Sequence, residues 1–255
     1  MAKTIVMLTG KGKSSRILYH ALSEDFHIEK IIQEEGVDRK KFLKRRAKRL
    51  GYWRVFGQIL FQGALVPLLK KTSKKRADEI MAKYRLNDHS IDKNAIKEVT
   101  SVNAQTCMEL LQNLKPDIVI VNGTRIISKK ILNCVDATFI NTHAGITPRY
   151  RGVHGGYWAL ANNDKDHCGV SVHLVDAGID TGGVLYQKNI EPTPHDNFST
   201  YPLLQLAEGI SLMKKAIKDV MAKQVKEVHP DLDSKLWSHP TIWSYMWKRI
   251  MRGVK

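Results

Sequence analysis

Cysteine is scarce in this chain of 255 residues, which contains only Cys107, Cys134 and Cys168. Their number is odd, they lie far apart, and no two of them form a Cys-x-x-Cys pair, so a disulfide framework and a zinc site are both disfavoured. Histidine, cysteine and aspartate do not cluster with metal-ligand spacing elsewhere in the sequence. We therefore expect a protein of a reducing cytoplasm that uses no metal.

Long apolar runs are also missing. The first ten residues contain a single lysine and a short apolar stretch, without the long hydrophobic region and the cleavage site of a signal peptide. No stretch reaches the roughly 18 uninterrupted apolar residues that a membrane span requires. Both absences favour a cytoplasmic location, either free in solution or at the inner membrane surface.

Acidic residues are absent from one long segment. Residues 39–77 carry 14 basic side chains and no acidic one, whereas the rest of the chain carries 27 basic and 25 acidic residues. The net charge of +16 therefore belongs to this segment and not to the whole fold. Such a block suggests that residues 39–76 meet an anionic partner, which could be a membrane surface, a nucleic acid or a phosphorylated substrate. The alternative is a solvated helix face.

The same segment reads as a helical insert over residues 38–86. Leu43, Ala47 and Leu50 recur at helical spacing among arginines and lysines. Residues 55–69 are then nearly all apolar, interrupted by glutamines, glycines and Pro67. We expect a helical hairpin packed on the domain, a lid, or an interfacial element with a basic flank.

Outside the insert, short apolar strands alternate with helices. Residues 118–121 form a continuous β-branched run, which is typical of a strand covered on both faces. The pattern predicts an α/β fold with a doubly wound, mostly parallel, Rossmann-like sheet whose ligands bind at the carboxyl ends of the strands. We expect one catalytic domain over residues 1–225 and a short helical tail over 226–255. The expected strands are 4–8, 26–33, 118–121, 138–141, 169–175 and 184–190, and the expected helices are 15–24, 102–113, 128–132, 157–162 and 203–223.

Three short motifs carry the chemistry. Asn141 and His143 lie two residues apart at the end of a predicted strand and therefore project to the same side. A run with the pattern Pro-x-Tyr-x-Gly follows at residues 148–152, and Asp180 lies between two glycines in a Gly-x-Asp-x-Gly run at 178–182. Glycines on either side of an acid suggest a tight loop that approaches a ligand closely.

In its motifs, their order and their separation, the chain resembles the folate-dependent formyltransferases. That family includes phosphoribosylglycinamide formyltransferase, methionyl-tRNA formyltransferase and the sugar N-formyltransferases. The resemblance is strong over residues 95–190 and loose over 4–33, and it does not extend to 38–86 or to the last thirty or so residues. It implies transfer of a formyl group from 10-formyltetrahydrofolate to a primary amine, without a metal.

The resemblance assigns a role to each member of the triad. The amide of Asn141 and a protonated His143 would donate hydrogen bonds to the carbonyl oxygen as negative charge develops there. Asp180 would accept the proton of the amine, directly or through a water, and would favour the imidazolium form of His143.

The resemblance also implies two binding regions. Backbone groups of two loops would read the edge of the folate pterin, although Ile126 and Ile127 could instead be ordinary core. Ser171 and His173 are expected either to pack beside the site or to contact and support its catalytic side chains. The pterin residues would be Thr124, Arg125, Ile126, Ile127, Leu174, Val175 and Asp176. A glycine-rich turn that opens a helix is a plausible anion site, and the amine substrate would contact Gly10, Lys11, Gly12, Lys13, Ser14 and His154.

The acceptor is open to several interpretations. The first is a small, phosphorylated, sugar-like amine, linked to a nucleotide or a lipid. Aminoacyl-tRNA is a second, disfavoured because that branch carries a C-terminal β-barrel. Water is a third, as in formyltetrahydrofolate hydrolases, whose N-terminal regulatory domain has no counterpart here. A non-catalytic, membrane-binding module of the same fold is the fourth.

Overall fold

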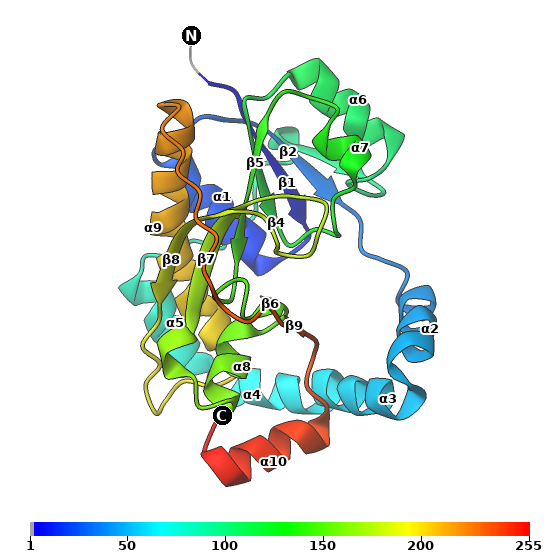
Figure 1. Cartoon of the computed structure of the whole chain (residues 1–255), viewed down its shortest axis with the longest axis vertical. Helices are drawn as coiled ribbons and strands as arrows, with labels where there is room; N and C mark the ends of the chain where they lie inside the picture. The colour runs from blue at the N-terminus through cyan, green and yellow to red at the C-terminus, as the bar shows by residue number, and fades with distance from the viewer. Residues whose placement is uncertain (1–2) are drawn as a thin grey trace.

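The computed structural model describes residues 3–255. Seven strands form one mixed sheet in the order β3-β2-β1-β4-β5-β7-β8 (Figure 1). Strands β1 to β5 are parallel, whereas β7 is antiparallel to β5 and β8 to β7. The predicted α/β class and mostly parallel sheet are confirmed. The strands are β1 (Ile5–Gly10), β2 (Ile28–Glu34), β3 (Ile96–Val99), β4 (Ile118–Asn122), β5 (Thr138–His143), β7 (Gly169–Leu174) and β8 (Val184–Asn189).

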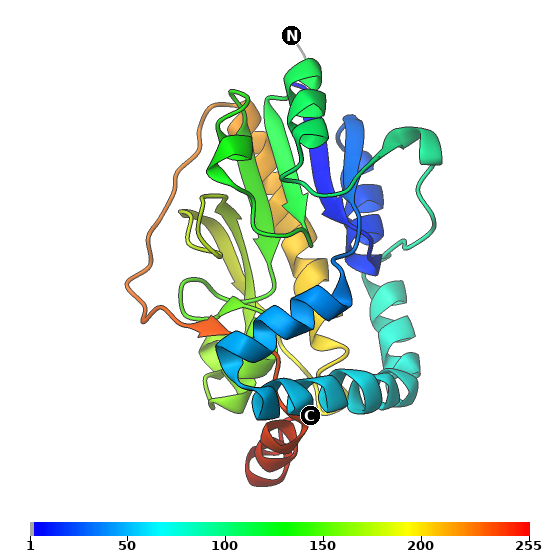
Figure 2. The same ribbon diagram turned by 90° about the vertical axis from the view of Figure 1, so that its right-hand side faces the viewer.

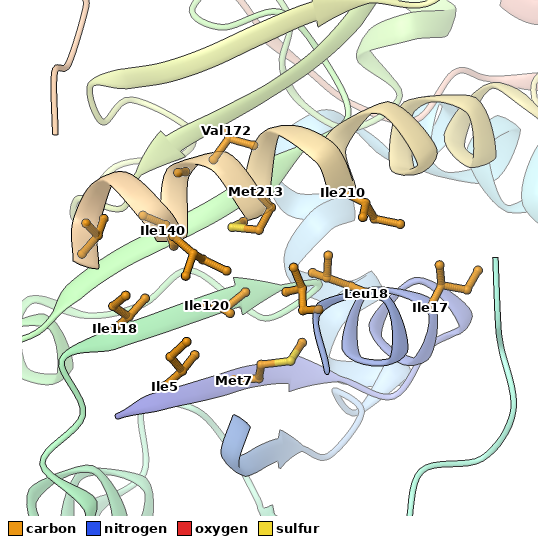
Figure 3. Packing of buried hydrophobic residues seen from close by; sticks show 14 of the residues in the cluster. Ile5, Met7, Ile17, Leu18, Ile118, Ile120, Ile140, Val172, Ile210 and Met213 are labelled. Carbon is orange, nitrogen blue, oxygen red and sulfur yellow. The ribbon is translucent and has the colours of Figure 1, made fainter. Parts of the chain in front are cut away.

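Helices cover both faces of the sheet. Helices α1 (Lys13–Ser23) and α9 (Tyr201–Met221) pack on one face against alternate strand residues such as Met7 and Ile120 (Figure 3). The intervening strand residues pack on the other face with α6 (Gln105–Leu114) and α7 (Lys129–Leu132). Because β1 and β4 are buried on both sides, their sequences are apolar throughout instead of alternating.

The order of the strands reverses between β1 and β4. In such a sheet the loops at the carboxyl ends of the two strands diverge and leave a crevice, which is the usual ligand position of α/β folds. Strand β3 was absent from the sequence prediction. It is a short edge strand in which Lys97 and Glu98 are exposed, so it shows no apolar run.

The insert contains four α-helices and one π-helical turn, with the bounds α2 (Arg39–Leu50), α3 (Tyr52–Leu60), η1 (Phe61–Leu65), α4 (Val66–Thr72) and α5 (Lys74–Lys83). Elements α3, η1 and α4 join end to end, so the apolar run at 55–69 is one continuous helix and the hairpin alternative is wrong. The π-helical turn η1 comes directly before α4. Pro67 lies in the first turn of α4, where a proline destabilises a helix only slightly. No helix among the described residues is both long and apolar enough to cross a membrane.

The C-terminal segment packs on both the insert and the loop after β5. Strand β9 (Leu236–Trp237) pairs with β6 (Arg151–Gly152), and α10 (Ile242–Arg252) contacts α3. The buried amide of Gln58 on α3 donates to the carbonyl oxygen of His239 at 2.6 Å. Two segments that the family motifs do not cover thus hold each other in place. The division of the chain at residue 225 stays a prediction. Helix α8 (Gly155–Ala161) and the short 3-10 helices η2 (Lys93–Ala95) and η3 (Lys165–His167) complete the fold.

The contact between α3 and α10 gives a stability prediction. A Cβ atom at Gly57 would lie 2.2 Å from the Trp243 ring, whereas nothing lies within 4 Å of a Cβ at Gly63 in the same helix. We expect Gly57→Ala to lower the free energy of unfolding by about 1–3 kcal/mol, because the ring must move. Gly63→Ala, the matched control, should raise it by about 0.5–1 kcal/mol. Urea unfolding of both variants tests this, and equal effects would contradict it.

Candidate active site

The predicted triad lies at the carboxyl end of β5. Asn141 and His143 leave the strand on the same side, and the loop between β7 and β8 brings Asp180 to them. The distance from His143 Nδ1 to Asp180 Oδ2 is 3.3 Å. All three residues line one cavity of about 360 Å³. Residues that are 39 positions apart in the chain are therefore neighbours at the crevice where the fold places its ligands.

The two glycine-containing motifs hold each other. The backbone N–H of Gly152 donates to Asp180 Oδ2 at 2.9 Å, and Arg151 donates to the carbonyl oxygen of Ile179 at 3.2 Å. Asp180 itself has a φ of 51°, in the left-handed region that few non-glycine residues adopt. A Cβ at Gly182 would lie 1.9 Å from the Leu174 carbonyl oxygen, so only glycine fits there. The run at 148–152 therefore fixes the carboxylate that the run at 178–182 supplies.

Asp180 is ionised in this environment. Burial raises the pKa of its carboxyl group, but electrostatic attraction to His143, the neighbouring His173 ring and the hydrogen bond from the Gly152 N–H outweigh burial and lower that pKa to about 2. The carboxylate therefore carries its full negative charge at neutral pH.

The protonation of His143 stays a prediction, because burial and its acceptor partners act in opposite directions. Burial lowers the pKa of His143, although the Asp180 carboxylate and the Tyr150 carbonyl act in the opposite direction. Its Nε2–H donates to the Tyr150 carbonyl oxygen at 2.7 Å. In the neutral ring Nδ1 is then unprotonated and faces the carboxylate. Two acceptors oppose each other across 3.3 Å, and a proton placed between them would relieve this repulsion.

His173 has the second of its two expected roles, because it contacts Asn141 directly. It is buried directly opposite Asn141 in the β5–β7 register. Its Nδ1–H donates to the Leu174 carbonyl oxygen at 2.7 Å, so its Nε2 accepts from the amide of Asn141 at 3.2 Å. Asp180 Oδ1 lies 3.7 Å from the same Nε2. The alternation of side chains along β7 could have identified His173, because it places the His173 side chain on the same side of the sheet as the loop at the end of the strand.

Ser171 fixes the loop that follows β5. Its hydroxyl group donates to the Gly145 carbonyl oxygen at 2.8 Å and accepts from the Thr147 backbone N–H at 3.0 Å. The side chain is fully buried. Ser171 therefore packs beside the site, as expected, and holds the chain between His143 and the 148–152 run.

Most of the predicted pterin residues surround the same cavity. The lining includes Thr124, Arg125, Ile126, Ile127, Val175 and Asp176 but not Leu174, which packs in the core. The two isoleucines differ, since Ile126 is 53% exposed and Ile127 is 3% exposed. Ile127 is therefore core, whereas Ile126 offers an apolar surface at the cavity.

Arg125 anchors its loop instead of reaching freely into the cavity. Its backbone N–H donates to buried Glu34 at 2.6 Å, and its guanidinium donates to the carbonyl oxygens of Glu35 and Thr100. These contacts join the loop after β4 to the ends of β2 and β3. Arg125 thus anchors this loop beside the cavity.

The predicted anion loop lies next to the cavity without lining it. Lys11 pairs with Glu98 at 2.6 Å, Lys13 pairs with Asp88 at 3.1 Å, and Ser14 donates to Asn122. None of the residues Gly10, Lys11, Gly12, Lys13 and Ser14 is part of the cavity lining. Both ammonium groups already have carboxylate partners, and a phosphate contact here stays a prediction.

His154 lies outside the cavity lining as well. Its ring packs 4.3 Å from the Phe198 ring, and its Nε2 lies 2.9 Å from His239 Nδ1. The side-chain nitrogen of Gln62 lies 3.0 Å from the same His239 Nδ1. Burial lowers the pKa of His154 to about 3 and, together with Arg46, that of His239 to about 4. His154 therefore contacts the C-terminal segment through His239.

These buried histidines predict acid sensitivity. A neutral histidine whose pKa falls on folding stabilises the protein above the ordinary pKa of 6.5, and that contribution is lost as the pH falls toward its folded value, here about 4 for His239. We expect His239→Asn to remove about 2 kcal/mol of the stability difference between pH 7 and pH 4.5. Urea unfolding at several pH values measures it. Exposed His27→Asn is the control, and an unchanged slope in His239→Asn would refute the assignment.

Comparison with known proteins agrees with the fold and the motifs. A family model described as Formyl transferase matches residues 66–217. Methionyl-tRNA formyltransferase of Finegoldia magna is 37% identical over 151 residues, which are 59% of this chain and 47% of that protein. The chain spans less than half the length of the curated relatives it matches.

Solved structures share the fold at low sequence identity. Phosphoribosylglycinamide formyltransferase from Anaplasma phagocytophilum has a TM-score of 0.58 at 15% identity, over 93% of this chain and all of that one. An N-formyltransferase from Helicobacter canadensis, in complex with folinic acid and dTDP-3-aminofucose, has a TM-score of 0.56 at 18% identity, over 93% of this chain and 71% of that one. With a family match over more than half of its residues, the chain belongs to the formyl transferase family.

Proposed function

We propose that this protein transfers a formyl group from 10-formyltetrahydrofolate to a primary amine. The observation that carries the proposal is the meeting of Asn141, His143 and Asp180 on one cavity at the carboxyl end of β5. Each residue type suits one demand of the reaction, and all three belong to the part of the chain that the family model covers.

The cavity suits the folate donor. Its volume of about 360 Å³ falls in the range of small-molecule sites, and its mouth exposes the apolar side chain of Ile126. We propose that the loops at 124–127 and 174–176 hold the pterin ring through backbone groups and Ile126. The relative from Helicobacter canadensis, which shares the fold, was solved with folinic acid.

Asn141 is the proposed donor to the formyl oxygen. Its amide carries two N–H groups, and His173 accepts one of them at 3.2 Å. The other N–H can donate to the oxygen as negative charge develops during attack of the amine. Removing one such donor costs about 2.7–4 kcal/mol in acyl-transfer sites. His173 is the proposed positioning residue, because its own tautomer is set by the Leu174 carbonyl.

His143 and Asp180 form the proposed proton acceptor. The lone pair of Nδ1 and the ionised carboxylate face the same point, where a proton is missing from an otherwise complete hydrogen bond. A proton released by the attacking amine would convert the repulsive pair into an imidazolium–carboxylate pair, and it would pass to N10 of tetrahydrofolate as the bond from N10 to the formyl carbon breaks. This order of events replaces the predicted resting imidazolium with one that forms during the reaction.

For the acceptor, we propose a small phosphorylated, sugar-like amine that carries a nucleotide or a lipid. Basic side chains of the insert would attract its phosphate groups. A relative with the same fold was solved in complex with dTDP-3-aminofucose, which is an amine of this kind. Methionyl-tRNA is the second candidate, because the 37% identical relative is a methionyl-tRNA formyltransferase.

The test is release of tetrahydrofolate from 10-formyltetrahydrofolate. Amino-sugar nucleotides, methionyl-tRNA and no amine at all would be supplied in parallel to the wild type and to His143→Ala. Release that requires an amino-sugar nucleotide supports the proposal, and release only with charged tRNA identifies the second candidate. Release without any amine indicates a hydrolase. No release under any condition, in wild type and variant alike, leaves only the non-catalytic module.

Loss of the oxyanion donor should be visible in the kinetics. We expect Asn141→Ala to lower kcat/KM by about 10²–10³-fold, since it removes a hydrogen bond made in the transition state. Asn94→Ala, on an exposed 3-10 turn, is the matched control and should leave kcat/KM unchanged. Steady-state assays with a saturating amine give both values, and equal kinetics for the two variants would remove Asn141 from the mechanism.

The proposed contact between the loop at 124–127 and the pterin can be tested by measuring binding alone. Ile126→Glu places a charge on the apolar surface of the cavity, so folinic acid should bind about 10–100-fold more weakly, as expected for loss of one buried aliphatic contact. Ile59→Glu has a comparable starting exposure on α3 and should bind folinic acid like the wild type. Isothermal titration calorimetry measures both affinities. Unaltered binding by Ile126→Glu would place the pterin elsewhere.

A further inference from the structure

The continuous helix formed by α3, η1 and α4 is apolar on its outward side as well as on its inward side. Its inward residues Phe61, Val66 and Leu69 belong to a buried cluster of the domain. A helix that is hydrophobic all round is normally buried, but this one has solvent on one side. Its exposed apolar residues recur at helical spacing and are Tyr52, Trp53, Phe56, Ile59, Leu60 and Leu68.

Helix α10 has the same character. Tyr245 is buried on its inner side, where it packs among the aromatic residues of the domain. Trp247 is 62% exposed and Ile250 is 74% exposed. The exposed apolar residues of α10 follow the spacing of one helix face and are Trp243, Met246, Trp247, Ile250 and Met251.

The two faces meet at a pair of tryptophans. The Trp53 and Trp243 rings are stacked with centroids 4.9 Å apart and an interplanar angle of 16°. Gly57 lies beneath the Trp243 ring and allows this close approach. Both views place α10 beside α3 and α4 at one end of the molecule (Figures 1 and 2). We call this surface, made of the eleven exposed residues named above, the tryptophan face.

Basic side chains flank the tryptophan face. Exposed Lys48, Arg49 and Arg54 lie at one end of the helix, and exposed Lys70 and Lys71 lie at the other. Helix α10 ends in Arg249 and Arg252. No acidic residue occurs between positions 39 and 77 to offset these charges. The surface therefore combines exposed aromatic and aliphatic groups with a strong positive charge.

We propose that the tryptophan face docks the protein on an anionic lipid bilayer. Tryptophan and tyrosine prefer the depth of the lipid head groups, where the ring is buried and its polar atom stays hydrated. Aliphatic side chains of α3 and α10 would enter the boundary of the acyl chains, while the flanking lysines and arginines contact lipid phosphates. This mode of binding lies along the bilayer surface and needs no membrane-spanning helix.

Charge and chemistry argue against the other occupants. A second copy of the chain would bring the same basic flanks into apposition, and like charges repel. A nucleic acid would use the basic residues and could stack on tryptophan, but it offers nothing to Ile250, Met251 or Ile59. Only an anionic lipid surface matches the aliphatic and the basic components together. The proposal does not depend on the formyl transfer reaction.

The full-length protein can be tested with vesicles of defined composition. We expect sedimentation with vesicles that contain phosphatidylglycerol and at least tenfold weaker binding to pure phosphatidylcholine vesicles, with binding reduced as salt is raised. Tryptophan emission should shift to shorter wavelength only with the anionic vesicles, because three of the five tryptophans lie on the face.

Matched variants separate the two components of the surface. Phe56→Ser with Ile250→Ser should weaken vesicle binding at least tenfold, whereas Val225→Ser, an exposed apolar residue after α9, should not weaken it. Lys48→Glu with Arg49→Glu should have a similar effect to the serine pair, whereas exposed Lys97→Glu with Lys129→Glu should have little. All the substituted side chains are exposed or partly exposed, and circular dichroism would confirm folding.

Several outcomes would overturn the proposal. Equal binding to both kinds of vesicle, binding to neither, or equal loss in the control variants would each do so. Concentration-dependent dimerisation that Phe56→Ser with Ile250→Ser abolishes would assign the face to a second copy instead. Binding of a single-stranded RNA oligonucleotide, without binding to anionic vesicles, would assign the surface to nucleic acid.

Discussion

The antiparallel pairing of β5 with β7 is the constraint on which the rest of the site depends. Its register sets Asn141 opposite His173 and His143 opposite Ser171. The same register ends β7 where the following loop can return Asp180 to His143, and the Gly152 N–H holds the carboxylate there. A slip of one residue would send the side chains to the opposite face. The site is therefore a property of strand register as much as of residue type.

Burial without complete pairing distinguishes this site from an ordinary structural ion pair. Both nitrogens of His143 face acceptors, while burial lowers the pKa of the ring. The surroundings of Asp180 outweigh its own burial and lower the pKa of its carboxyl group. A proton placed between these two buried groups would bind favourably, and the proposed reaction releases one. Burial also lowers the pKa of His154 and His239, which join the loop before α8 to the C-terminal segment.

The insert and the tail hold each other in place through direct contacts. Gln58 and Gln62 reach the tail at His239, and Trp53 reaches it at Trp243. Strand β9 meanwhile pairs with the residues that hold Asp180. A disturbance of the outer helices can therefore reach the catalytic loop through one short strand. The proposed lipid surface and the proposed active site lie on the two sides of this connection.

The sequence by itself determined the fold class, the buried strands and the three motifs, because apolar periodicity and glycine chemistry act locally. It also located the excess charge in one segment. Tertiary structure alone decided the partners of His143, the contact of His173 with Asn141 and the position of His154, since each depends on residues far away in the chain. It also decided that the apolar helix at 52–72 leaves one side uncovered and that α10 extends that surface. Helical spacing shows which residues share a face, but only packing shows which face the protein leaves to its surroundings.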